Sequence, residues 1–122
     1  RDGAVLQPTV LLDTDAGMRV NCEEVFAPVT TVRPYTDFDA AIAEVNASPY
    51  GIQTGVFTHD MRRILHAFER LDVGGVVVND VPGFRVDHAP YGGVKASGLG
   101  REGVRYAMDE MTELRLLVLG DH

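Results

Sequence analysis

The chain has 122 residues, 45% apolar and 24% charged, which is ordinary for one soluble globular domain with its own core. Its formal net charge of -7 argues against a nucleic-acid partner, because phosphate binding requires a basic face. No apolar run approaches the roughly 20 residues that span a bilayer, so we expect no membrane insertion and a cytoplasmic location. We find no signal-peptide pattern, and because the sequence opens on Arg1 rather than Met we expect a piece of a longer protein.

In the first part of the chain, strand-like and helix-like apolar patterns alternate. Residues 10–12 and 29–32 read as short strands, with a turn-like segment at 13–18 between them. A helix follows, and either Thr36 or Asp37 can cap it by accepting a backbone N–H bond. We expect its apolar face to consist of Phe38, Ile42 and Val45, and its end to lie at Pro49 and Gly51.

The middle of the chain repeats the strand and helix pattern. Residues 54–58 predict a strand, Asp60 is a plausible cap for the next helix, and Gly74 and Gly75 supply its stop. Residues 76–78 form a β-branched run of the kind found in buried parallel strands. The inward face of the helix is predicted to consist of Met61, Ile64, Leu65, Phe68 and Leu71.

A long loop rich in glycine and proline, residues 80–100, leads to the end of the chain. Residues 101–111 predict a helix, and residues 114–119 predict a last apolar strand. That strand has no obvious partner along the chain, so it needs a sheet edge that another subunit would supply. The inward face of the last helix is predicted to consist of Val104, Ala107, Met108 and Met111.

The order of these elements predicts an α/β fold. Strand, helix, strand, helix and strand in succession are typical of a parallel sheet with right-handed crossovers, here a βαβαβ unit. A C-terminal helix and a terminal strand follow that unit.

Two segments carry most of the functional information: NCEEVFAPV at residues 21–29 and PYGGVKASGLGREG at residues 90–103. With NASPYGI and VFTHD between them, they resemble the C-terminal segment of the aldehyde dehydrogenase superfamily over essentially the whole chain. The resemblance implies that residues 1–111 are the last part of the catalytic domain. It implies that residues 112–122 are an oligomerisation strand and tail, and that the parent oxidises an aldehyde to a carboxylate with NAD or NADP.

The resemblance implies two cofactor residues. Glu24 matches the carboxylate that holds the hydroxyls of the nicotinamide ribose, and a carboxylate is suited to accept from a diol. Phe26 matches an aromatic residue beside that ribose. From the residues alone, Glu24 reads as a solvated charge and Phe26 as a core side chain. Ala27 departs from the family's glycine, which puts in doubt how closely the backbone approaches the cofactor.

The resemblance places a substrate pocket in the loop at residues 84–91. Its form resembles members acting on small hydroxylated or anionic aldehydes, such as lactaldehyde or phosphonoacetaldehyde. Phe84 and Tyr91 would be wall residues, and Arg85 would bind a carboxylate or phosphonate in a bidentate way. The alternatives are that Arg85 pairs with Asp87 or is solvated, and that His88, the fourth candidate, simply packs.

The glycines of the second motif, Gly92, Gly93, Gly98 and Gly100, do not have the spacing of a phosphate-binding loop, and we attribute them to close backbone packing. The resemblance also assigns Arg101 and Glu113 to subunit contacts in a homo-oligomer. An interfacial Arg–Glu pair fixes the register of the two partners. The alternative is two ordinary surface charges.

No catalytic residue is expected in this chain. The family's thiolate nucleophile lies in a Gly-Gln-x-Cys context and its base in a Glu-Leu-Gly-Gly segment, and neither occurs here. Cys22, the only thiol, stands where the family reserves no cysteine, so we interpret it as structural or incidental. No metal site is expected. Two alternatives stay open: a stand-alone assembly or binding module, and a subunit that completes the active site of a separate chain.

Overall fold

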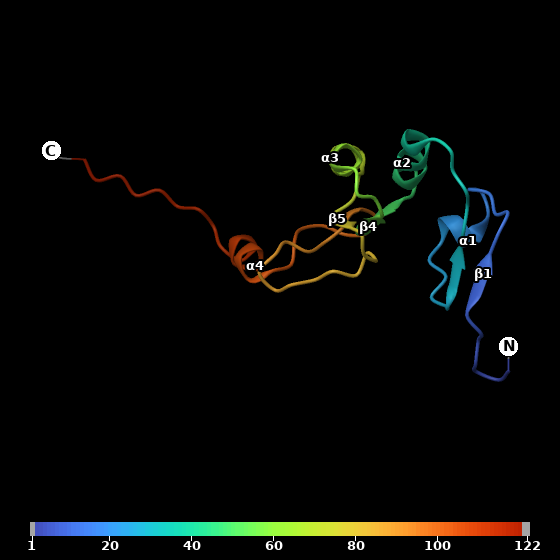
Figure 1. Ribbon diagram of the computed structural model, residues 1–122. Helices are drawn as coiled ribbons and strands as arrows, with labels where there is room; N and C mark the ends of the chain where they lie inside the picture. Colours follow the sequence, from blue (N-terminus) through green and yellow to red (C-terminus); the bar gives the residue numbers. More distant parts are fainter. Residues whose placement is uncertain (1, 121–122) are drawn as a thin grey trace. The chain divides into compact units, whose positions relative to one another are not determined.

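The computed structural model describes residues 2–120, and its internal contacts divide the chain into two units, Arg1–Ser48 and Pro49–His122. Each unit combines short strands with helices (Figure 1). The mixed α and β character that the sequence predicts is therefore confirmed. No helix within residues 2–120 is long and apolar enough to cross a membrane.

The first unit is built on a pair of parallel strands. β1 (Thr9–Leu11) lies beside β2 (Val29–Thr31), with Thr9 opposite Val29. Both strands fall within one residue of their predicted positions. Between them the chain forms α1 (Arg19–Cys22), a single turn that the sequence did not predict, because four residues are too few to show helical periodicity.

The helix of the first unit, α2 (Phe38–Asn46), begins where the sequence predicts. The Asp37 carboxylate accepts from the Ala40 N–H at 2.7 Å and so satisfies one of the free donors at the helix start. Ile42 is buried, and Phe38 and Val45 are half-buried on the same face. The predicted apolar face of this helix is confirmed.

The second unit contains a βαβ crossover. β4 (Gln53–Val56) and β5 (Gly75–Val78) pair in parallel, and α3 (Met61–Arg70) connects them. Asp60 caps α3 by accepting from the Arg62 N–H at 2.9 Å, as the sequence predicts. A second sheet in this unit pairs β3 (Tyr50–Gly51) with β6 (Val94–Lys95) in antiparallel fashion.

The prediction of one continuous βαβαβ sheet is wrong. The described residues form three two-stranded sheets, which are β1–β2, β3–β6 and β4–β5. Apolar periodicity identifies a strand but does not name its partner, which explains the error. The β3–β6 pair was missed because two-residue strands carry no alternation to detect, and it places β6 inside the predicted loop at residues 80–100.

The predicted inward faces of the last two helices are confirmed only in part. On α3, Leu71 is buried and Ile64 half-buried, but Met61, Leu65 and Phe68 are 54 to 68% exposed. On the last helix, α4 (Val104–Glu110), Ala107 is half-buried, but Val104 and Met108 are exposed, as is Met111 just beyond it. The apolar spacing indicates a face that needs a cover. Nothing in the described part of the chain supplies that cover.

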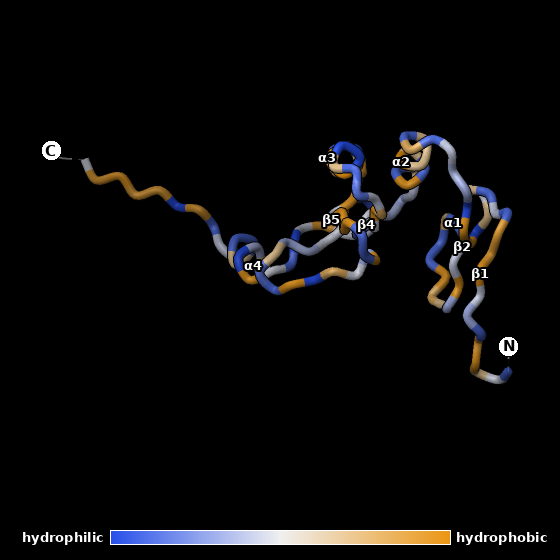
Figure 2. The backbone as a smooth tube through the Cα atoms, viewed as in Figure 1, coloured by the Kyte–Doolittle hydropathy of each residue, from blue (hydrophilic) through white to orange (hydrophobic). Residues whose placement is uncertain are grey.

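The C-terminal segment, residues 114–119, forms no strand within the described chain. Its apolar side chains are exposed. Figure 2 shows the segment as a hydrophobic, orange stretch of the chain beyond α4. A strand without a neighbouring edge has no hydrogen-bond partners, so the segment cannot form a ladder alone. Its assignment as an oligomerisation strand, and the domain boundary at residues 111 and 112, stay predictions.

Loss of the Asp60 cap is expected to destabilise the second unit. Asp60→Ala removes the acceptor for the Arg62 N–H and should lower the free energy of unfolding by about 1 kcal/mol, measured by urea denaturation. Asp60→Asn keeps a side-chain acceptor and serves as the control. Equal loss in both variants would show that the cap bond contributes nothing.

Candidate functional site

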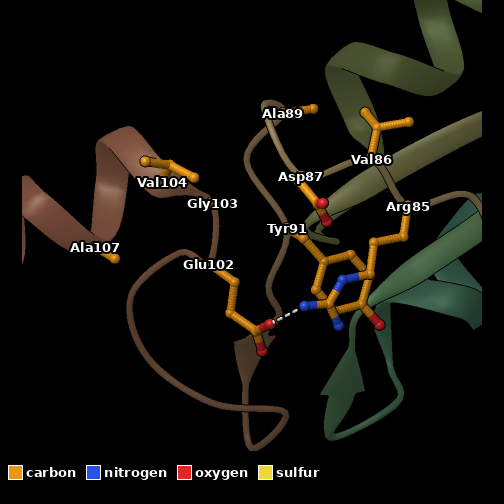
Figure 3. Close-up of a pocket in the computed structure, with 9 residues that line it drawn as sticks. All are labelled: Arg85, Val86, Asp87, Ala89, Tyr91, Glu102, Gly103, Val104 and Ala107. Carbon is orange, nitrogen blue, oxygen red and sulfur yellow. Dashed lines mark hydrogen bonds and ion pairs between the residues drawn. The ribbon is translucent and has the colours of Figure 1, made fainter.

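A pocket of about 250 Å³ opens in the second unit beside the loop before β6. It lies between two segments of the chain, residues 85–91 and 102–107 (Figure 3). The polar side chains on its wall are Arg85, Asp87, Tyr91 and Glu102. One cation, two carboxylates and a phenol therefore face the same small volume.

Arg85 has two partners in this pocket. Its Nη2 donates to the Glu102 carboxylate, and its guanidinium lies over the Tyr91 ring, 4.7 Å from the ring centroid. The carboxylate that pairs with Arg85 is thus Glu102, and the alternative prediction of an Arg85–Asp87 pair is wrong. Both side chains of the pair are more than half exposed, so water screens the attraction and the pair is worth under about 1 kcal/mol.

A second pocket, of about 140 Å³, adjoins the same loop. Phe84, Arg85 and Tyr91 all line it, together with residues of β5. The Phe84 carbonyl accepts from Gln53 Nε2 at 2.8 Å, which ties the loop to β4. Three of the four predicted substrate residues therefore come together, and Arg85 and Tyr91 belong to both pockets. His88 is exposed and lines neither.

Two backbone hydrogen bonds between Tyr91 and Glu102, here called the Tyr91–Glu102 bridge, join the two segments that line the first pocket. The Tyr91 N–H donates to the Glu102 carbonyl at 3.1 Å, and the Glu102 N–H donates to the Tyr91 carbonyl at 2.6 Å. Residues 92–101 form the loop between these two positions. Sequence analysis did not select Glu102, although the residue stands in the REG end of the second motif.

Close packing accounts for three glycines of this loop. Gly93 is buried, and a Cβ there would collide with the Ser97 side chain. A Cβ at Gly92 would lie 2.9 Å from the Gly100 carbonyl oxygen. Gly98 and Gly100 have φ of 133° and 72°, which side chains with a Cβ rarely adopt. The predicted packing role is confirmed at Gly92 and Gly93, and also at Gly100, where a Cβ would meet the Glu110 carboxylate. At Gly98, which has no close neighbour, the reason is conformational.

The two predicted interface residues have different surroundings. Arg101 Nη1 donates to the carbonyls of Gly93 and Gly100, at 3.0 and 2.6 Å, so its side chain is engaged within its own chain. Glu113 is exposed just beyond α4. The subunit contact of both residues stays a prediction.

The two predicted cofactor residues lie in the first unit, between α1 and β2. Glu24 is exposed, and Phe26 is 91% exposed, so the alternative of a core phenylalanine does not hold in this chain. Phe26 has φ of 46°, a left-handed conformation that is unusual for an aromatic residue. Such an outlier costs on the order of 1 kcal/mol or more and is a reason to suspect a function.

Cys22 is a free, exposed cysteine at the end of α1. Its thiol donates to the Met18 carbonyl at 3.3 Å. Nearby, the Glu23 carboxylate bonds to Arg19 and raises the pKa of that guanidinium above its ordinary value. Across residues 2–120, no three His, Cys, Asp or Glu side chains gather in a group that could hold a metal ion.

The chain is similar to curated aldehyde dehydrogenases along nearly its full length. A 3-sulfolactaldehyde dehydrogenase of Priestia aryabhattai is 48% identical over 119 residues, 98% of this chain and 25% of that protein. A sulfoacetaldehyde dehydrogenase of Neptuniibacter caesariensis is 41% identical over 118 residues, 97% of this chain and 26% of that protein. The chain thus spans about a quarter of the length of these relatives.

Solved structures agree. Aldehyde dehydrogenase 21 of Physcomitrella patens, in complex with its reaction product succinate, matches with a TM-score of 0.93 at 48% identity, covering 98% of this chain and 25% of that one. A glyceraldehyde-3-phosphate dehydrogenase of Methanocaldococcus jannaschii complexed with NADP has a TM-score of 0.82 at 45% identity, covering 91% and 24%. An NAD+ complex of a Bacillus cereus aldehyde dehydrogenase has a TM-score of 0.86 at 36% identity, covering 93% and 23%.

Residues 1–117 match the sequence pattern of the aldehyde dehydrogenase family, and the motifs at residues 21–29 and 90–103 lie inside that match. The chain belongs to the aldehyde dehydrogenase family.

Proposed function

We propose that this chain is the C-terminal part of an NAD(P)-dependent aldehyde dehydrogenase that oxidises an aldehyde carrying an anionic group. The observation that carries the proposal is the position of Arg85, which lies on the wall of both pockets and against the face of Tyr91. A planar guanidinium there can donate two parallel bonds to a carboxylate, sulfonate or phosphonate.

The surroundings of Arg85 support this role. The Tyr91 ring under the guanidinium restricts its orientation and adds a favourable cation–π interaction. Relatives of this chain are named for 3-sulfolactaldehyde and sulfoacetaldehyde, and one similar structure holds succinate. A sulfonate and a carboxylate are both negatively charged, and each presents at least two acceptor oxygens that Arg85 would recognise.

The carboxylates of the pocket set a condition on this binding. Glu102 accepts from Arg85 Nη2, and Asp87 lines the same pocket, so an anion that binds through that nitrogen must take the place of Glu102. Since the Arg85–Glu102 pair is exposed and weak, the substrate loses little by displacing it. The same two carboxylates disfavour an anion that cannot reach Arg85 directly.

The cofactor residues of the proposal are Glu24 and Phe26. They fit a nicotinamide nucleoside, because an exposed carboxylate accepts from the two ribose hydroxyls and an exposed aromatic ring packs against the sugar. A bound nicotinamide would supply the hydride acceptor for the oxidation. The role of Glu24 is to fix the ribose and thereby the ring that it carries.

The remaining assignments are part of the same proposal. The thiolate nucleophile and the carboxylate base belong to another part of the parent protein. Residues 1–111 complete its catalytic domain, and residues 112–122 form the strand that joins a neighbouring subunit, with Arg101 and Glu113 at that contact. The parent is a cytoplasmic homo-oligomer without a nucleic-acid partner.

In the full-length enzyme, Arg85→Met should reduce kcat/KM for sulfoacetaldehyde by roughly 10- to 100-fold, since charge-assisted bonds contribute about 1.5–3 kcal/mol. Propionaldehyde, which has no anionic group, should lose little. Arg85→Lys keeps the charge without the planar donor pair and should fall between. Equal losses for both aldehydes in steady-state assays would contradict the anion-binding role.

Glu24→Gln should raise KM for NAD+ by roughly tenfold, because a neutral amide replaces the charged acceptor of the ribose hydroxyls. The KM for the aldehyde should stay close to its original value. Glu23→Gln, an exposed neighbour that bonds to Arg19, is the matched control. An unchanged KM for NAD+ in the Glu24 variant would remove this residue from the cofactor site.

The purified chain alone is expected to reduce no NAD+ or NADP+ with sulfoacetaldehyde, because it contains neither the nucleophile nor the base. The assay follows the absorbance of the reduced nicotinamide. Turnover by the chain, free of any longer enzyme, would overturn this part of the proposal. Activity that appears only when the separately purified upstream part is added would favour the alternative of a complementing subunit.

A further inference from the structure

The Arg101 side chain makes hydrogen bonds within its own chain, in addition to any subunit contact that the family resemblance implies. Its Nη1 donates to two carbonyl oxygens, those of Gly93 and Gly100, which lie on opposite sides of the loop of residues 93–100. Its backbone N–H donates to the Glu110 carboxylate at 3.2 Å, which links the same loop to α4. One side chain thus holds the two ends of the loop together.

We propose that Arg101 is a positioning residue that fixes the wall on which Arg85 rests. This proposal depends on the anion-binding role of Arg85 proposed above. The loop that Arg101 closes ends directly in the Tyr91–Glu102 bridge, whose two N–H···O bonds set the spacing of those residues. The side chains of the same two residues contact Arg85, one through its ring and the other through its carboxylate.

The chain of contacts explains why an arginine suits this position. Gly93 is buried, and a Cβ at Gly92 would meet the Gly100 carbonyl and Arg101, so there is little free space between the two ends of the loop. Only a long side chain with two donors on one terminal nitrogen reaches both carbonyls from this side. The Nζ of a lysine lies one bond closer to the backbone than the Nη1 of an arginine, so we expect a lysine at position 101 not to bond to both carbonyls.

The intramolecular role leaves room for a subunit contact. Both carbonyl bonds come from Nη1, so the Nε and Nη2 groups of Arg101 are available to other partners. A substitution at Arg101 therefore has two separate consequences, one in the pocket of its own chain and one in assembly. The test must read the pocket directly.

Amide hydrogen exchange by NMR reads the bridge in the 122-residue chain. In Arg101→Met, the Tyr91 and Glu102 amides should exchange about tenfold faster, because two hydrogen bonds that hold the loop are lost. The Gly75 and Asn79 amides, which donate to the Ile52 and Val56 carbonyls, should keep their protection. Arg105→Met, which removes an exposed arginine of α4, is the matched control and should leave all four amides unchanged.

Methanesulfonate titration reads the consequence for Arg85. If the positioning role holds, Arg101→Met should weaken methanesulfonate binding at least about threefold, and Arg105→Met should leave it unchanged. Unchanged exchange at Tyr91 and Glu102, or faster exchange with unchanged methanesulfonate affinity, overturns the proposal.

If Arg101→Met also loses the Gly75 and Asn79 protection, its effect extends beyond the loop, and the Arg101→Lys variant is used for the test instead. It should lose protection only at Tyr91 and Glu102, and wild-type exchange there overturns the proposal.

The two proposals fail in different ways. If the unsubstituted chain binds no methanesulfonate, the anion-binding role of Arg85 fails. The exchange rates of Tyr91 and Glu102 still show whether Arg101 holds the bridge.

Discussion

The pocket depends on the two hydrogen bonds between Tyr91 and Glu102. They are backbone bonds, so they set the distance between the two segments without regard to side-chain identity. The side chains of the same residues then confine Arg85, one by its aromatic face and one by its charge. The loop between these two backbone positions is tightly packed, because a Cβ at Gly92 or Gly93 would meet neighbouring atoms.

Each unit buries few apolar side chains. Within residues 2–120 the first unit buries Ile42 and the second buries Val56, Ala67 and Leu71, whereas many larger apolar side chains on α3, α4 and the C-terminal segment are exposed. Exposed apolar stripes of this kind mark surfaces that another part of a protein covers. This agrees with a chain that spans about a quarter of the length of its relatives. The βαβ unit and the pocket loop form from local contacts despite this small number of buried side chains.

Local chemistry was predictable from the sequence. Asp60 was identified as a helix cap, and Asp37 as one of two candidates with Thr36, because short polar side chains before an apolar periodic run commonly cap a helix. The family resemblance placed a substrate loop at residues 84–91, and the structure brings Phe84, Arg85 and Tyr91 of that loop together. What the sequence did not provide was pairing between distant residues. The Glu102 partner of Arg85 is 17 positions away, and no periodicity relates a loop residue to one beyond the next strand.

The electrostatics of the pocket follow from the same arrangement. In the proposed anion-binding role, an arginine beside two carboxylates favours an anion that reaches the guanidinium directly over one that does not. The exposed Arg85–Glu102 pair costs little to separate, so this selection would lose little affinity for a well-placed anion. Before an anion binds, the Glu102 carboxylate restricts the orientation of the Arg85 side chain. A mobile arginine would instead lose side-chain entropy on binding, and the contact with Tyr91 reduces that loss further.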